Sequence, residues 1–303
     1  MNSTETRKGV LLALFACLIW GLAPVYFKFI QQVPALEILT HRVVWSFFFM
    51  VILLSLYRLW PAVKQVCRHP KKILALALTA SLIGSNWLLY IWAVNNNHLL
   101  EASLGYFINP LVSVLLGIIF LGERFRVMQW AALLLAMTGV LVQLWTFGSL
   151  PIIALGLAFS FSFYSLLRKK IGVDAQAGML IETLWLLPVA SIYLFAIADS
   201  PTSDMTANSW LLNLLLIFAG VITTVPLLCF TAAANRLRLS TLGFFLYSGP
   251  ILIFLLATLL YGEVVTQDKL VTFGFIWVAL ILFITDAIYT QRRARKALKA
   301  QLS

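Results

Sequence analysis

Three ionisable side chains, Glu37, His41 and Arg42, stand close together in an otherwise apolar stretch of this chain. Glu37 and His41 are four residues apart, so a helix would place both of them on one face. A charge inside a membrane-spanning helix is costly unless it is paired, reaches the interface or faces water. Two interpretations of Arg42 therefore stay open: a snorkelling or structurally paired side chain, and a residue that lines a path for a polar solute.

Two further acidic residues lie inside apolar stretches. We predict that Glu101 pairs with Arg42 or shares a water-filled outer vestibule with it. Glu182 could relay protons or complete a binding site, but it could equally occupy a helix start, where negative charge is favoured. Coupling to protons would need a titratable group in the path, because only such a group can carry the proton. The candidates are His41, Glu101 and Glu182.

Two prolines, Pro110 and Pro250, also fall inside apolar runs. A proline has no N–H to donate, so the carbonyls of Tyr106 and Leu246 lose their helical partners. Within a bilayer such a carbonyl needs another donor or a cavity. The prolines therefore indicate either a matched pair of kinked helices that line a central site, or packing kinks satisfied by a neighbouring Ser or Thr. Polar side chains at the same depth are Asn109 and Tyr247.

Aromatic and amide side chains complete the set. Trp20, Asn86 and Trp87 could stack on a flat solute or bind its polar groups, although packing and interfacial positions are common alternatives for such rings. The residues that we predict to line a solute path are Trp20, Glu37, His41, Arg42, Asn86, Trp87, Glu101, Tyr106, Asn109, Pro110, Glu182, Tyr247 and Pro250.

The elements that must position these residues are membrane spans. Of the 303 residues, 62% are hydrophobic and 11% are charged, and the mean hydropathy is +0.96. A soluble protein could not hide so much apolar surface. The fold class that we predict is an all-α polytopic membrane protein with ten transmembrane helices. Their expected positions are 10–30, 36–57, 73–94, 99–121, 127–145, 151–167, 178–198, 210–234, 240–261 and 270–289.

Basic residues predict the orientation of these spans. With ten spans and a cytoplasmic N-terminus, 19 of the 22 Lys and Arg residues fall on the cytoplasmic side, which includes a basic tail at 290–303. The positive-inside rule therefore favours both termini in the cytoplasm. The net charge of +11 then indicates topology and contact with anionic lipid, and no nucleic-acid partner is expected.

A motif occurs twice along the chain. SLGYFINP at 103–110 precedes Gly122-Glu123, and TLGFFLYSGP at 241–250 precedes Gly262-Glu263. Chance similarity between apolar helices is the alternative, but the matched spacing favours a duplication. Each copy would contain five spans, an odd number, so the halves at 8–145 and 151–289 would be inverted repeats. We interpret the Gly-Glu pairs as turns that end a helix.

These strings, together with IWGLAPVYFK and LTHRVVWSFFFM, resemble the EamA branch of the drug/metabolite transporter superfamily, and within it the RarD-like group. The resemblance covers essentially the whole chain. It implies two five-helix repeats around a central cavity in the inner membrane of a bacterium. It also implies export of a small organic metabolite or drug by alternating access, and an association, by name, with chloramphenicol sensitivity.

Other functions are compatible with the predicted fold. A passive channel or a lipid flippase could share this fold. We expect no ATP-driven transport by this chain alone, because it has no GK[ST] loop, and no enzyme, because it has no HExxH motif or nucleophile elbow. The three cysteines lack metal-ligand spacing, so no cofactor or metal is expected. The expected partners are a small-molecule solute, the lipid bilayer and, as a candidate coupling ion, protons. The oligomeric state is left open.

Overall fold

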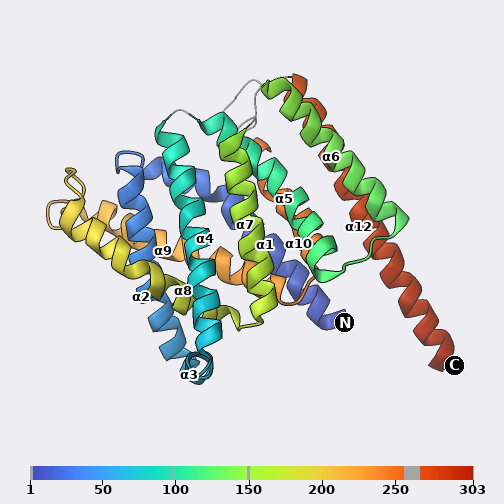
Figure 1. Cartoon of the computed structure of the whole chain (residues 1–303), viewed down its shortest axis with the longest axis horizontal. Helices are drawn as coiled ribbons and strands as arrows, with labels where there is room; N and C mark the ends of the chain where they lie inside the picture. Colours follow the sequence, from blue (N-terminus) through green and yellow to red (C-terminus); the bar gives the residue numbers. More distant parts are fainter. Residues whose placement is uncertain (1–2, 97, 149–150, 256–266, 303) are drawn as a thin grey trace.

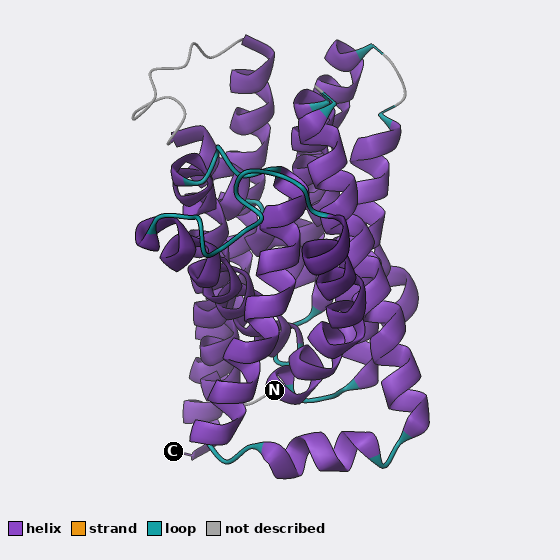
Figure 2. Ribbon diagram, turned by 90° about the vertical axis from the view of Figure 1, so that its left-hand side faces the viewer, coloured by secondary structure: helices purple, strands orange, loops and turns teal. Residues whose placement is uncertain are grey.

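The computed structural model describes residues 3–96, 98–148, 151–255 and 267–302. Every regular element in this part of the chain is helical, and Figures 1 and 2 show a bundle of long helices. The elements are α1 Ser3–Phe29, α2 Ala35–Leu56, α3 Trp60–Cys67, α4 Pro70–Asn95, α5 Leu99–Leu121, α6 Val127–Phe147, α7 Ile152–Ile171, α8 Ala175–Ile192, η1 Tyr193–Ile197, α9 Trp210–Ala234, α10 Leu239–Leu246, α11 Ser248–Leu255 and α12 Gln267–Leu302.

The helices agree closely with the expected spans. Among the described residues, nine helices are long and apolar enough to cross a membrane, so the prediction of a polytopic membrane protein is confirmed. The tenth expected span, 240–261, corresponds to α10 and α11 and then runs past the described residues. Two helical features were not predicted: the short helix α3 in the connection 58–72, and the continuation of α12 through the basic tail.

Glycines end several of these helices. Gly122, Gly148 and Gly172 follow α5, α6 and α7 and adopt φ values of 62°, 75° and 60°. Residues with a side chain rarely adopt this left-handed conformation, whereas glycine does so without steric cost. The predicted turn at Gly122 is therefore confirmed. The corresponding Gly262-Glu263 pair lies outside the described residues.

The packing pairs define the bundle. Helix α6 lies side by side with α12 at one edge of Figure 1. Helix α5 packs against α7 and α10, α1 against α9 and α11, α2 against α8 and α9, and α4 against α7 and α8. Small residues permit close approach at these contacts, because the backbones of membrane helices meet best where no side chain intervenes. A Cβ at Gly220 of α9, for example, would meet the α2 backbone at 2.5 Å.

The outer surface of the bundle is strongly apolar. Val127, Trp145 and Phe195 are each more than four-fifths exposed, which is the pattern expected for residues that face lipid rather than water. Both termini and α3 lie towards the same end of the bundle (Figures 1 and 2). A site for a polar solute would therefore lie between the helices.

The two prolines are accommodated differently. Pro110 lies within the single helix α5, whereas the chain near Pro250 divides into α10 and α11 at Tyr247. The break is accompanied by side-chain donors, since Ser248 Oγ and Cys17 Sγ both donate to the Phe245 carbonyl, at 2.5 and 3.4 Å. The two extra residues between glycine and proline in the second motif accompany this break. The two helices are thus not kinked in the same way.

Candidate functional site: two buried charged clusters

The first charged cluster surrounds Arg42, two turns into α2. Its Nε donates to Thr223 Oγ1 of α9 at 2.8 Å, and that hydroxyl in turn donates to the Ala219 carbonyl at 2.7 Å. The guanidinium carbon lies 4.9 Å from the ring centroid of Trp87 in α4 and 5.7 Å from that of Phe27 in α1. Four helices therefore meet at one cation, and two of them contribute aromatic faces that stabilise it.

Tyrosines extend this cluster towards α5. Tyr90 of α4 and Tyr106 of α5 have ring centroids 6.0 Å apart, and both hydroxyls lie near Arg42. Helices α2 and α5 are not among the closely packed pairs. Tyr106 is 43% exposed. We call Phe27, Arg42, Trp87, Tyr90, Tyr106 and Thr223 the Arg42 cluster.

The other ionisable residues of α2 have local partners. Glu37 is buried, and its Oε2 accepts from Thr202 Oγ1, in the loop before α9, at 2.9 Å. His41 is also buried, and its Nδ1 accepts from Trp45 Nε1 at 3.2 Å, while its Nε2 has no hydrogen-bond partner among the described residues. Glu37 thus ties α2 to the loop at 198–209. It does not form an ion pair with Arg42.

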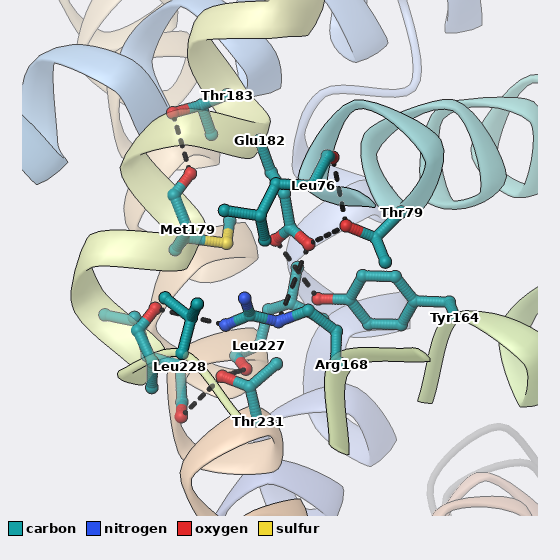
Figure 3. A network of polar contacts seen from close by, with 12 residues as sticks. Leu76, Thr79, Tyr164, Arg168, Met179, Glu182, Thr183, Leu227, Leu228 and Thr231 are labelled. Carbon is teal, nitrogen blue, oxygen red and sulfur yellow. Dashed lines mark hydrogen bonds and ion pairs between the residues drawn. The ribbon is translucent and has the colours of Figure 1, made fainter. Parts of the chain in front are cut away.

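The second charged cluster joins α4, α7 and α8 (Figure 3). Arg168 Nε lies 3.5 Å from Glu182 Oε1, and the two side chains are only 1% and 2% exposed. Thr79 Oγ1 donates to the same carboxylate oxygen at 2.5 Å, and the Tyr164 hydroxyl donates to Oε2 at 3.4 Å. We call Thr79, Tyr164, Arg168 and Glu182 the Glu182 network. It is a fully buried ion pair in which the carboxylate accepts two hydrogen bonds, whereas among the described residues Arg168 donates only from Nη2, to the Ala175 carbonyl.

Two local features make this network possible. Gly178 leaves room for the guanidinium, since a Cβ there would overlap Arg168 Nη1. The start of α8 is capped by Asp174, whose carboxylate accepts from the amides of Gln176 and Ala177 at 3.1 and 3.4 Å. Asp174 therefore fills the helix-start position that was one interpretation of Glu182. Glu182 instead lies two turns into the helix.

The two clusters occupy corresponding positions. Arg42 and Glu182 are each seven residues beyond the first residue of their helix, α2 and α8. Each forms a hydrogen bond with a threonine of another helix, Thr223 in α9 and Thr79 in α4. The two differ in access, because the Glu182 network is sealed whereas Arg42 is only partly buried and Tyr106 is well exposed.

The amides predicted to line the path lie at helix interfaces. Asn86 Nδ2 donates to the Leu157 carbonyl and to Ser160 Oγ of α7, at 2.9 and 2.8 Å. The Asn109 side-chain oxygen accepts from Ser162 Oγ, also of α7, at 2.8 Å. Both amides therefore join α4 and α5 to α7, where an interhelical hydrogen bond satisfies a polar group away from water.

Three further predicted residues are Trp20, Tyr247 and Glu101. Trp20 packs against Phe161 and Phe230, with ring centroids 5.8 and 5.5 Å away. Tyr247 is buried at the break between α10 and α11, and its hydroxyl has no hydrogen-bond partner. The side chain of Glu101 lies outside the described residues, so its predicted pairing with Arg42 stays a prediction.

Glu123 has a role that its sequence context did not indicate. Its carboxylate accepts from the backbone amides of Leu239 and Ser240, at 2.6 and 2.9 Å, and from the Ser240 hydroxyl. These amides form the first turn of α10, which has no side-chain cap of its own. Glu123 thus caps a helix that begins 116 residues later, where a negative charge is favourable.

Comparison with known proteins identifies the family. Residues 7–145 match the EamA-like transporter family. The chain is 72% identical to Protein RarD of Salmonella typhimurium over 97% of this chain and 100% of that protein, and 71% identical to Protein RarD of Escherichia coli over 98% and 100%. The chain belongs to the EamA-like transporter family. Among its relatives is the Chloramphenicol-sensitive protein RarD of Pseudomonas aeruginosa, at 33% identity over 96% of this chain and 98% of that protein.

The predicted RarD-like membership of the EamA family is thus confirmed over the whole chain. A relative from Vibrio cholerae, 58% identical over 98% of both chains, is described as an uncharacterized transporter. A crystal structure with 17% identity has a TM-score of 0.70 and covers 91% of this chain and 96% of its own. That likeness supports the fold alone. The EamA-like protein described here is therefore a multi-pass membrane protein of a transporter family.

Proposed function

We propose that this protein is a secondary transporter that moves a small organic solute by alternating access, outward across the bacterial inner membrane. The observation that carries the proposal is the difference between the two charged clusters. The Glu182 network is buried between α4, α7 and α8, whereas Arg42 is only partly buried and Tyr106 of the same cluster is 43% exposed. One end closed and one end open is the arrangement expected of a carrier in one of its two states.

Inverted repeats at 8–145 and 151–289 are part of this proposal. The helix pairs α2–α8, α5–α10 and α6–α12 each join counterparts of the two halves. The other large contacts come in equivalent sets: α5–α7 corresponds to α1–α11, α4–α7 to α1–α9, and α2–α9 to α4–α8. This pairing supports a two-fold axis in the membrane plane, as in other carriers built from inverted repeats. The basic tail at 290–303 and both termini would then lie in the cytoplasm.

The proposed cycle follows from that symmetry. Glu182 and Arg42 stand at corresponding positions in inverted halves, so they would lie towards opposite membrane faces. Opening the cytoplasmic side requires α4, α7 and α8 to separate, which breaks the Glu182 network. Breaking a buried ion pair is costly unless water hydrates both partners. The network would therefore hold the inner side closed until the outer side closes around Arg42.

Counterflow tests the carrier function. The purified protein is reconstituted into liposomes preloaded with an unlabelled solute, and the entry of the labelled solute is followed for chloramphenicol, amino acids and nucleosides. A carrier shows entry that is stimulated by internal solute. A passive channel would give solute entry without this stimulation, and a lipid flippase would move labelled lipid instead. Either result would contradict the proposal if internal solute stimulates the entry of none of the tested solutes.

Protons are the proposed coupling ion. Glu182 and His41 are the predicted titratable candidates whose side chains the structure describes, and both are buried between helices. An imposed pH gradient should drive accumulation of the solute that counterflow identifies, and Glu182→Gln should abolish that accumulation while leaving exchange measurable. Accumulation driven equally well in the variant and the wild type would remove Glu182 from the coupling path.

A further inference from the structure

We infer that the Arg42 cluster binds the carboxylate of a monoanionic organic solute and holds its flat apolar body against the surrounding rings. The inference rests on the proposed transport function and names the class of solute. It is carried by the geometry of the guanidinium and by the chemistry of the side chains around it.

The guanidinium of Arg42 has donors to spare. Its Nε donates to Thr223, and among the described residues neither Nη1 nor Nη2 has a hydrogen-bond acceptor, while the side chain as a whole is only partly buried. The guanidinium is held by the hydrogen bond to Thr223 and by cation–π contacts with Trp87 and Phe27. The two terminal nitrogens therefore present a fixed fork, which matches the two oxygens of a carboxylate.

Among the side chains that the structure describes, no acidic group forms an ion pair with Arg42, and the nearby Glu37 carboxylate accepts from Thr202 instead. The side chain of Glu101 lies outside this set. The chain treats its other buried arginine differently, because Arg168 is paired with Glu182. A cation at membrane depth without an anion is costly. A bound anion would remove that cost, so the site favours a solute that supplies one.

The side chains around the guanidinium determine which solute body fits beside the carboxylate. Trp87, Tyr90 and Tyr106 offer aromatic surface, and the two tyrosines add hydroxyl groups at its edge. Aromatic walls with a few placed polar groups are typical of pockets for flat organic molecules. A single cation complements one negative charge, which favours a carboxylate over a phosphate dianion. A cationic solute is disfavoured, because Arg42 would repel it and already occupies the Trp87 face.

A matched set of three probes tests this inference: 3-phenylpropionate, 3-phenylpropionamide and 3-phenylpropylamine, which share a ring and chain but differ in charge. Binding to the full-length protein in detergent is followed by the shift in its thermal unfolding midpoint. We expect the carboxylate to raise the midpoint and the amide and amine to leave it unchanged. In Arg42→Gln the apparent affinity for the carboxylate should fall at least about tenfold, a loss of roughly 1.4 kcal/mol.

Two further variants keep the test decisive. Arg236→Gln is the matched control, because it removes an arginine that is bound to Glu5 rather than to the cluster, and it should bind the carboxylate like the wild type. If Arg42→Gln does not fold, Arg42→Lys replaces it. Lysine keeps the charge but loses the fork, so the preference for the carboxylate should persist with weaker affinity.

Several results would overturn the inference. These are equal shifts with the amide or the amine, unchanged carboxylate binding in the Arg42 variants, and no shift with 3-phenylpropionate up to its solubility limit. Counterflow with the same three probes separates this failure from failure of the transport proposal. Binding that depends on Arg42 without exchange would refute the carrier alone. Exchange of the amide or amine but not the carboxylate would refute the recognition alone.

Discussion

Replacing Glu182 by glutamine should destabilise the folded protein strongly. The substitution keeps the size of the side chain and its capacity to accept from Thr79, but it leaves Arg168 charged and buried without an anion. Both side chains of this pair are almost completely inaccessible, at 1% and 2% exposure. Removing one partner of such a buried pair costs about 3–5 kcal/mol. Since the Nε–Oε1 distance is 3.5 Å, we expect a value near the lower end.

A surface pair in the same protein provides the control. Arg236 and Glu5 approach more closely, at 2.9 Å, but their side chains are 35% and 45% exposed. Water solvates both charges when this pair is broken, so Glu5→Gln should destabilise the protein far less than Glu182→Gln. Distance alone would rank the two pairs in the opposite order. Burial decides the outcome, because it determines whether the remaining charge can be hydrated.

The assay is reversible unfolding of the purified protein in mixed micelles of mild detergent and SDS. The free energy of unfolding is compared for the wild type, Glu182→Gln, Glu5→Gln and the double variant Arg168→Met/Glu182→Leu. The double variant removes both charges, so it should be more stable than Glu182→Gln. A Glu182→Gln cost below about 1 kcal/mol, the range of an exposed pair, or a double variant less stable than the single one, would refute the reasoning.

Three further substitutions test the local structure by the same unfolding measurement. Gly178→Ala should destabilise by about 1–3 kcal/mol, because the new methyl group overlaps Arg168 and forces it to move; stability equal to the wild type would show that the guanidinium lies elsewhere. Glu123→Ala should cost about 0.5–2 kcal/mol through loss of the α10 cap, and hydrogen exchange at the Leu239 and Ser240 amides should rise, whereas unchanged exchange would contradict the cap. Ser162→Ala should cost about 1 kcal/mol, since Asn109 loses the closer of its two hydroxyl donors and keeps only Ser113, at 3.4 Å; a neutral effect would indicate that Ser113 takes its place.

Much of the fold could be predicted from the sequence. Local composition predicts the membrane spans, because an apolar run of about 20 residues has few alternatives to a helix in a bilayer. The basic residues at the ends of these runs predicted an orientation, with both termini in the cytoplasm. Helix α3 was missed because Trp60–Cys67 is short and only partly apolar, and the helical tail because its basic composition carries no span signal.

The partners of the charged residues could not be predicted in this way. Arg168 stands near the end of an apolar run, so it counted as a topology signal, and nothing nearby in the sequence indicates that it turns inward to Glu182. Glu123 likewise caps a helix far along the chain. Such pairs depend on which helices pack together, and the pattern of a single helix does not contain that information. The pathway role of Arg42, by contrast, was one of two interpretations that its type and depth already suggested.

The most direct measurement of the central claim is the accessibility of the two clusters. In a variant without Cys17, Cys67 and Cys229, single cysteines replace Tyr106 or the buried Leu76, and sealed vesicles of either orientation are treated with a membrane-impermeant maleimide. We predict that position 106 reacts from the outer face alone and that position 76 does not react. In Glu182→Gln, position 76 should become reactive from the cytoplasmic face while labelling of position 106 falls. Reaction of both positions at once would indicate a continuous pore, and unchanged labelling in Glu182→Gln would show that the Glu182 network does not close the inner side.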